Sequence, residues 1–226
     1  YLMITLDSLN FDEALRYMGC KKGMADNNTI NILSECEQLV ISSSIPRYCY
    51  KVFDTNEIET GIEILGTNLI LNGKDIKKHL NNCFGVVLMC ATLSGKIDTL
   101  IRKAQLEDMS KAIAINSLAS VAIEQVCDLA EVEITSYMTN HYLTYRFGFG
   151  YGDLPLELEK DILMVLQGPK TIGLCTTEAN ILTPLKSVVC VIGISEKPME
   201  KGQKGCTTCN IKDTCKYRRQ GLNCAY

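Results

Sequence analysis

Several features are missing from this sequence, and each absence limits what the protein can do. With a formal net charge of −3 over 226 residues, it lacks the basic footprint that nucleic-acid binding requires. It lacks a long apolar run, because the longest, residues 86–93, is far shorter than the roughly 20 residues that span a bilayer. No cleavable signal is visible either. We therefore expect a cytoplasmic protein with no nucleic-acid or membrane partner.

Sequence motifs of several enzyme classes are also missing. The chain has no nucleophile elbow, P-loop or His-Glu-x-x-His sequence, so hydrolase, nucleoside-triphosphatase and zincin functions have no support. The chain does have the length and the apolar fraction, 46%, to bury one core, with room for a small appendage. Because it begins at Tyr1, we expect a trimmed start or a fragment, with Met3 as a candidate first residue.

Cysteine, by contrast, is abundant, and its twelve residues are unevenly distributed. Eight lie in apolar segments and are expected to be reduced, mostly buried thiols. The remaining four, Cys206, Cys209, Cys215 and Cys224, crowd the C-terminal end. Such density in a reducing compartment predicts a metal site, either zinc or an iron-sulfur cluster. Disulfides or unliganded thiols are the alternatives.

Composition divides the C-terminal part of the chain into two further segments. Residues 196–205 are charged and almost free of apolar side chains, so they are interpreted as a linker between a domain at 1–195 and a Cys-rich tail at 206–226. Basic residues surround the tail thiols. They indicate a solvated face, or a surface that docks an acidic flavodoxin-like electron donor. These residues are Lys212, Lys216, Arg218 and Arg219.

Hydrophobic periodicity and turn residues predict helices and strands that mingle without a regular βαβ alternation. We therefore expect an α+β fold with a mainly antiparallel sheet. The expected helices cover residues 11–18, 28–43 (capped by Asn27 or Asn28), 73–80, 96–105, 108–134 and 155–166. The expected strands cover residues 48–53, 62–65, 69–71, 84–91, 142–147, 171–174 and 186–194.

Two of the expected helices carry specific predictions. The helix at 155–166 is expected to be capped by Asp153 or Leu154, to hold Pro155 in its first turn and to stop at Gly168-Pro169. The long helix at 108–134 is expected to bury one apolar stripe. That stripe consists of Met109, Ala112, Ile113, Leu118, Ala122, Val126 and Leu129.

The clearest candidate site is the stretch 146–155, Arg-Phe-Gly-Phe-Gly-Tyr-Gly-Asp-Leu-Pro. Its glycines, at 148, 150 and 152, allow positive φ and let a ligand touch the main chain. Arg146 offers a planar charged fork for a carboxylate or phosphate, and Tyr151 is available to stack on a flat ring. The stretch therefore predicts a loop that binds a small anionic ligand. The alternative is a glycine-rich strand edge or bulge whose aromatic side chains belong to the core.

This stretch resembles the Arg-x-Ala-Pro-Gly-Tyr-Pro-x-x-Pro signature of the activation (reactivation) domain of cobalamin-dependent methionine synthase, which binds S-adenosylmethionine there. Arg146, Gly150, Tyr151 and Pro155 fall on matching positions. The chain departs from the signature at Gly148, where the family has Ala, and at Phe149 and Gly152, where it has Pro. Upstream blocks extend the resemblance over most of the chain and resemble stand-alone activation-domain-like proteins of anaerobic bacteria. These blocks are residues 91–98, 102–105, 108–109 and 124–128.

The resemblance implies a curved α+β domain that binds S-adenosylmethionine on its inner face. Arg146 would hold the ligand carboxylate, the main chain of Gly148 and Gly150 would contact the ligand, and Tyr151 would pack against its adenosine. The implied function is a stand-alone reactivation subunit that supports reductive methylation of cob(II)alamin on a partner cobalamin-dependent methionine synthase. The electron would come from a flavodoxin- or ferredoxin-like donor. No side chain need act as acid or base, so no catalytic residue is expected.

Departures from the family keep two other functions open. Neither His79 nor His141 lies in the Asp-x-His-x-x-Gly context of a cobalamin-ligating loop, so we expect cobalamin on the partner. Where the family has a Trp-Tyr pair, this chain runs from Pro184 to the aliphatic Val191 and Ile192. The chain could then be a non-catalytic S-adenosylmethionine-binding module. Alternatively, its tail cluster passes the electron, and the chain is an iron-sulfur electron-transfer or corrinoid-activating protein.

Two further positions bear on the ligand that the resemblance implies. Ser120 stands in register with the family's ligand-binding Glu, and a serine cannot supply the same charge. Lys186 offers a different polar contact in the stretch that has lost the family's aromatic pair. Lys186 is therefore a candidate for a changed ligand contact.

Overall fold

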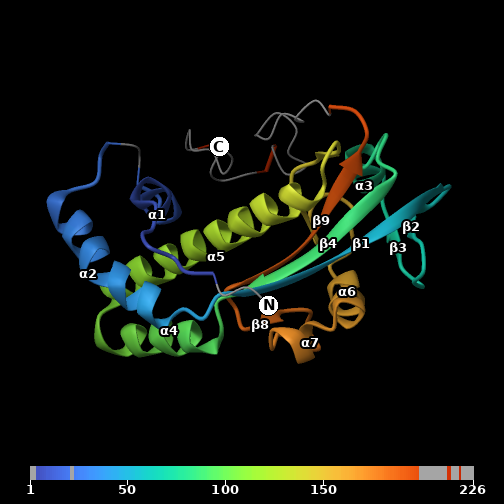
Figure 1. Cartoon of the computed structure of the whole chain (residues 1–226). Coiled ribbons are helices and arrows are strands. Elements are labelled where there is room, and N and C mark those ends of the chain that lie inside the picture. The colour runs from blue at the N-terminus through green and yellow to red at the C-terminus, as the bar shows by residue number, and fades with distance from the viewer. Residues whose placement is uncertain (1–3, 21–22, 199–212, 215–218, 220–226) are drawn as a thin grey trace. The chain divides into compact units, whose positions relative to one another are not determined.

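The computed structural model describes residues 4–20, 23–198, 213–214 and 219 (Figure 1). These residues fall into two compact units, which are described separately. Unit 1 comprises Tyr1–Tyr50, Met89–Tyr137 and Glu159–Val189. Unit 2 comprises Lys51–Leu88, Met138–Leu158 and Cys190–Tyr226.

A seven-stranded sheet has the strand order β3-β2-β1-β4-β9-β5, and β6 also pairs with β9. Strand β2 is antiparallel to β1 and β3, and β9 is antiparallel to β5 and β6. The expected α+β fold with an antiparallel sheet is therefore confirmed. The strands are β1 (Arg47–Ile58), β2 (Gly61–Ile64), β3 (Ile70–Asn72), β4 (Gly85–Thr92), β5 (Tyr142–Leu143), β6 (Phe147–Gly148) and β9 (Ser187–Ser195).

Strand β4 is the most deeply buried element of the sheet. All eight of its residues are buried, as the continuous apolar run at 84–91 predicts for a strand covered on both faces. The strand expected at 142–147 is instead two short ones, β5 and β6, because Thr144 to Arg146 interrupt the ladder between them. The Thr144 N–H still donates to the Gly193 carbonyl at 3.0 Å.

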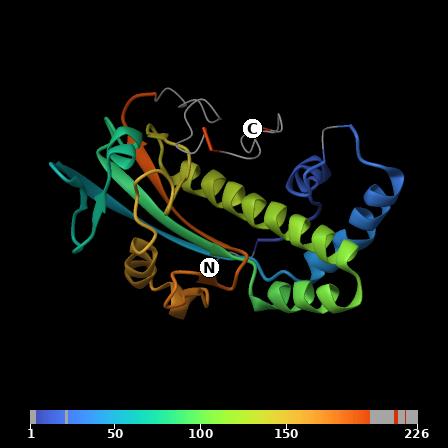
Figure 2. The ribbon, with the colours of Figure 1, turned by 180° about the vertical axis from the view of Figure 1, so that it is seen from behind.

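In unit 1 the long helix α5 (Met109–Tyr137) contacts three other helices: α1 (Phe11–Tyr17), α2 (Asn27–Ser43) and α4 (Gly95–Glu107). Figures 1 and 2 show α2 and α4 against the N-terminal half of α5 from both sides. The stripe predicted for α5 is partly wrong. Met109, Ile113 and Leu129 are exposed, whereas small side chains such as Ala114 and Ala119 are fully buried. Because helices surround α5, more than one face of it is covered.

Helix α5 is also the one helix of the described residues whose length and composition would let it cross a membrane. Within its most apolar window, 61% of the residues are buried in the structure. A buried core helix meets the same criterion. The contacts of α5 with α1, α2 and α4 are those of such a core helix. The sequence did not indicate this helix as a span because polar residues interrupt its apolar pattern.

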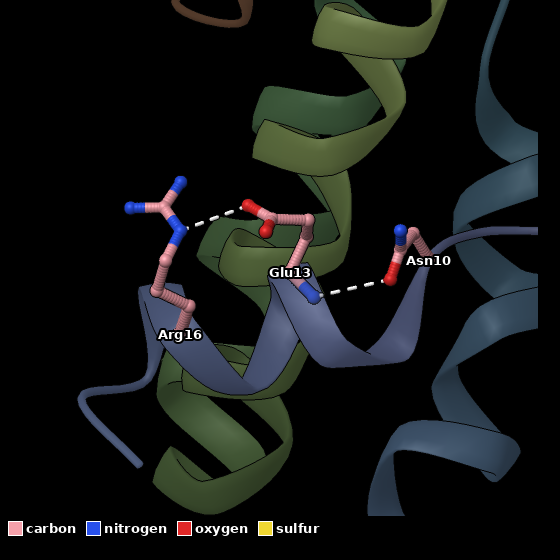
Figure 3. A network of polar contacts seen from close by, with 3 residues as sticks. All are labelled: Asn10, Glu13 and Arg16. Carbon is pink, nitrogen blue, oxygen red and sulfur yellow. Dashed lines mark hydrogen bonds and ion pairs between the residues drawn. The ribbon is translucent and has the colours of Figure 1, made fainter. Parts of the chain in front are cut away.

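Side-chain caps fix where the first two helices begin. Asn10 accepts a hydrogen bond from the Glu13 N–H at 3.2 Å, and the Glu13 carboxylate pairs with Arg16 Nε at 2.8 Å (Figure 3). Asp26, and not Asn27 or Asn28, caps α2 by accepting from the Thr29 N–H at 2.7 Å. An aspartate outcompetes these neighbours because its charge also favours the positive end of the helix.

The segment after the candidate loop differs from the prediction. Helix α6 spans Leu158–Leu166, so it begins three residues after Pro155, which is not in its first turn. Gln167 adopts a left-handed conformation (φ 56°) and ends α6, and Gly168-Pro169 then starts a short helix, α7 (Gly168–Thr171). The strand expected at 171–174 is therefore wrong, because a proline in the first helical turn favours α7.

Two small elements complete the described chain. A two-stranded sheet of β7 (Cys175–Thr176) and β8 (Leu182–Thr183) follows α7 in unit 1. In unit 2, the short helix α3 (Lys74–His79) lies between β3 and β4. This helix contacts β2 and β3 and supports the candidate loop.

Candidate functional site

The candidate loop lies in unit 2 and starts at strand β6. Phe147 pairs with Val191 of β9, and Gly148 pairs with Cys190. Arg146, which precedes β6, is half-buried. The sheet therefore fixes the backbone next to Arg146, the residue predicted to bind a carboxylate. An ordered backbone lowers the entropy cost of ligand binding.

A closed turn follows this strand. The Gly150 N–H donates to the Leu154 carbonyl at 3.0 Å, and the Leu154 N–H donates to the Tyr151 carbonyl at 3.1 Å. Gly150 and Gly152 have positive φ, 77° and 58°, as predicted, but Gly148 does not because it belongs to β6. Since the Gly150 N–H already donates within the turn, only the Gly150 carbonyl is left to contact a ligand.

The aromatic side chains of the loop divide between core and surface. Phe149 is buried and belongs to the core, as the alternative interpretation of the stretch expects. Tyr151 is 71% exposed, and its ring lies close over Gly148, where an added Cβ would come within 3.0 Å of ring atom Cδ2. A glycine at 148 thus lets one edge of the ring approach the backbone closely. The Tyr151 ring remains open for stacking on a planar group.

Asp153 ties the end of the loop to α3. Its Oδ2 accepts from the Lys74 N–H at 2.6 Å and its Oδ1 accepts from the Asp75 N–H at 3.0 Å. The hydrogen bond from Lys74 is the main cause that lowers the pKa of Asp153. The prediction that Asp153 caps the following helix is wrong. It caps α3 instead, because α3 has no side-chain cap of its own and Gly73 before it leaves room for the carboxylate.

The other end of α3 holds the strand that enters the loop. His79 is buried, and its Nε2 lies 2.9 Å from Thr144 Oγ1, which also accepts from the Gly193 N–H at 2.8 Å. The His79 ring centroid lies 4.5 Å from that of Tyr145 and 4.9 Å from that of Phe147. Helix α3 is therefore attached to the loop at both ends, and the sequence showed neither attachment.

In unit 1 Ser120 and Lys186 form a contact with each other. Lys186 Nζ donates to Ser120 Oγ at 2.8 Å. Burial lowers the pKa of Lys186, and the negative charge of Asp98 partly offsets this. Val191 and Ile192, in unit 2, are fully buried. Their aliphatic side chains provide no hydroxyl group.

Near Asp98 the structure shows polar groups that the sequence did not single out. Ser94, which precedes α4, has φ 79° and ψ 163°, a region almost restricted to glycine. Its Oγ and the Oδ1 of Asp98 are buried and have no hydrogen-bond partner among the described residues. The other oxygen of Asp98, Oδ2, accepts from the Leu185 N–H at 3.0 Å. The sequence predicts a turn at residues 92–95, before the helix expected at 96–105. It does not show that Ser94 adopts a strained conformation, because serine is an ordinary turn residue.

The predicted metal ligands Cys206, Cys209, Cys215 and Cys224 lie outside the described residues. The predicted linker and tail are described only at residues 196–198, 213–214 and 219. Over the part of the chain that the structure describes, no three His, Cys, Asp or Glu side chains are grouped to hold a metal ion. The metal site stays a prediction.

Comparison with solved structures finds the crystal structure of the MetH reactivation domain bound to AdoHcy. The TM-score is 0.62 at 14% sequence identity, and the match covers 95% of this chain and 82% of that chain. No family model matches this sequence, and no curated protein matches it. At this identity the likeness establishes the fold alone. The chain therefore has the MetH reactivation-domain fold that its sequence resemblance implied.

Proposed function

We propose that the chain binds S-adenosylmethionine through the loop Arg146–Asp153 and acts in the reactivation of a cobalamin-dependent methionine synthase. The observation that supports this most is an exposed tyrosine, Tyr151, on the same loop as Arg146, with that loop fixed to α3 through Asp153. The solved structure with the same fold carries AdoHcy, which is S-adenosylmethionine without its transferable methyl group. The positive charge of Arg146 is complementary to the carboxylate of such a ligand.

In this proposal, the residues of the chain bind and orient S-adenosylmethionine. Arg146 holds the ligand carboxylate with its two-pronged fork. Tyr151 packs on the adenine ring, and the Gly148 and Gly150 carbonyls face polar groups of the ligand. When bound, the ligand supplies a sulfonium methyl group for transfer to the cobalamin of the partner. Correct positioning alone can contribute about 7 to 11 kcal/mol to such a transfer.

Cobalamin belongs to the partner in this proposal. His79 is occupied with Thr144 and with two aromatic rings, and His141 packs its ring 5.2 Å from that of Phe84. Neither is placed in a cobalamin-ligating motif. The electron donor remains the expected flavodoxin- or ferredoxin-like protein, and the proposed place of action is the cytoplasm.

A second candidate function is a ligand-binding module that does not support methyl transfer. It is favoured by the full burial of Val191 and Ile192, which replace the aromatic pair that the family has near the ligand. Titration of the full chain with S-adenosylmethionine and AdoHcy tests the shared claim of binding. Methyl transfer to a cobalamin-loaded methionine synthase, followed by the absorbance of the cobalamin, then separates the two. Binding without transfer favours the module, and absence of binding to either ligand contradicts both.

A further inference from the structure

Two cysteine thiols of unit 1 lie in contact between neighbouring strands. Sγ of Cys49 in β1 is 3.3 Å from Sγ of Cys90 in β4, and these strands are adjacent in the sheet. Neither residue is in a disulfide in this structure. Neighbouring strands of a sheet lie about 4.7 to 4.9 Å apart, and a disulfide joins Cα atoms roughly 4.4 to 6.8 Å apart. A bond between these sulfurs therefore requires little movement of the backbone.

The two thiols differ in access. Cys90 is fully buried in β4, whereas Cys49 is only half-buried. Cys49 Sγ also lies 3.8 Å from the carbonyl oxygen of Leu166, at the end of α6. A thiol has one proton, so when Cys49 donates to Leu166 its sulfur must accept from Cys90. In that arrangement the hydrogen bonds run from Cys90 through Cys49 to Leu166, the last residue of α6.

We propose that Cys49 and Cys90 form a reversible disulfide when the chain meets a low-molecular-weight disulfide. The Cys49 thiolate, which is nearer to solvent, attacks one sulfur of the oxidant. A mixed disulfide forms and one small thiol leaves. The Cys90 thiolate then attacks the Cys49 sulfur, the protein disulfide forms and the second small thiol leaves. Two electrons and two protons pass from the cysteines to the oxidant, which is reduced to two thiols.

Oxidation changes the end of α6. A disulfide has no S–H group, so the Leu166 carbonyl loses the donor that Cys49 provides. Since Gln167 already ends the helix in a left-handed conformation, the last turn of α6 should open more readily. Amide hydrogen exchange at residues 163–167 should therefore become faster in the oxidised protein.

The test is disulfide mapping of the full chain after incubation with oxidised glutathione. Remaining thiols are alkylated, and peptides are analysed without reduction. We expect a linked pair of peptides containing Cys49 and Cys90, which dithiothreitol separates. A Cys175→Ser variant is the matched control, because Cys175 is an exposed cysteine of the same unit. It should give the same linked pair.

A second variant traps the intermediate. In Cys90→Ala the resolving thiol is gone, so Cys49 should retain one glutathione, seen as the corresponding mass increase on its peptide. If that variant fails to fold, the map of the unmodified chain still decides the matter. Alkylation of both Cys49 and Cys90 after Cys175 has been oxidised, or a link from Cys49 to a different cysteine, would overturn the proposal.

Discussion

The Asp153 carboxylate accepts a hydrogen bond from the backbone N–H of Lys74 at 2.6 Å, which joins the candidate loop to a helix 79 residues earlier in the chain. Lys74 and Asp75 begin α3, whose first N–H groups have no partner within the helix. The loop thus caps the helix, and the helix fixes the loop. This reciprocal arrangement leads to the first prediction.

Asp153→Ala should lower both stability and ligand affinity, because it removes the cap of α3 and releases the loop. A lost aspartate cap costs about 0.5 to 2 kcal/mol, to be measured by urea unfolding. Asp153→Asn keeps one of the two acceptor oxygens, so its losses should be smaller than those of Asp153→Ala. The control is Asp26→Ala, which removes the cap of α2 in unit 1 and should leave S-adenosylmethionine affinity unchanged. Equal loss of affinity in both variants would show that the effect is general.

Gly152→Ala should destabilise the protein more than Gly173→Ala does. Both glycines have positive φ, 58° and 72°, so each alanine has a left-handed penalty of roughly 1 to 2 kcal/mol. An added Cβ at 152 would also lie 3.0 Å from Cβ of Asp75, whereas at 173 it meets nothing within 4 Å. The difference between the two unfolding free energies therefore measures the approach of the loop to α3. Equal values would mean that this approach contributes nothing.

Glu159 should make stability fall as pH rises. Burial raises the pKa of this carboxyl, in the first turn of α6, to about 7. Between its unfolded pKa, roughly 4.3, and 7, the native state binds more protons than the unfolded state, so stability declines through this window. Glu159→Gln should remove this decline and be more stable than the original protein at pH 8, by on the order of 2 kcal/mol. Parallel pH profiles of the two proteins would contradict the assignment.

Ser94→Gly should stabilise unit 1. The backbone at 94 has φ 79° and ψ 163°, and strain of this kind costs about 1 to 3 kcal/mol in a non-glycine residue. Glycine relieves the strain and also removes a buried hydroxyl that has no partner among the described residues. Ser94→Ala is the matched variant, since it removes the same hydroxyl but keeps the Cβ. Thermal unfolding should therefore rank glycine above alanine, and the reverse order would show that strain is unimportant here.

Much of the fold could be predicted because periodicity and burial act locally. The buried strand β4 and the helices α1, α2, α4 and α5 begin and end within a few residues of their expected positions. The exceptions arise where a distant partner decides the structure. Asp153 has suitable neighbours for capping the next helix, but it caps α3, which is far away in sequence.

The residues of the candidate loop could be predicted from the sequence, but the contacts that hold the loop in place could not. The sequence placed Arg146, Gly150 and Tyr151 on one loop, and the structure puts Tyr151 at the surface and Phe149 in the core. The sequence alone could not show that His79 contacts Thr144, since that contact joins residues 65 positions apart. Likewise, Lys186 and Ser120 were separate positions until the fold brought them to 2.8 Å. Contacts across such separations depend on packing and not on local pattern.

Isothermal titration of S-adenosylmethionine into the protein and its Arg146→Ala variant tests the central claim most directly. The account predicts that the unmodified chain binds and that the variant loses about 1.5 to 3 kcal/mol, the contribution of a charged hydrogen bond. Arg16→Ala is the control, because Arg16 pairs with Glu13 on α1 in unit 1. The affinity of this variant for S-adenosylmethionine should be unchanged. Equal affinity of the unmodified protein and Arg146→Ala would contradict the account.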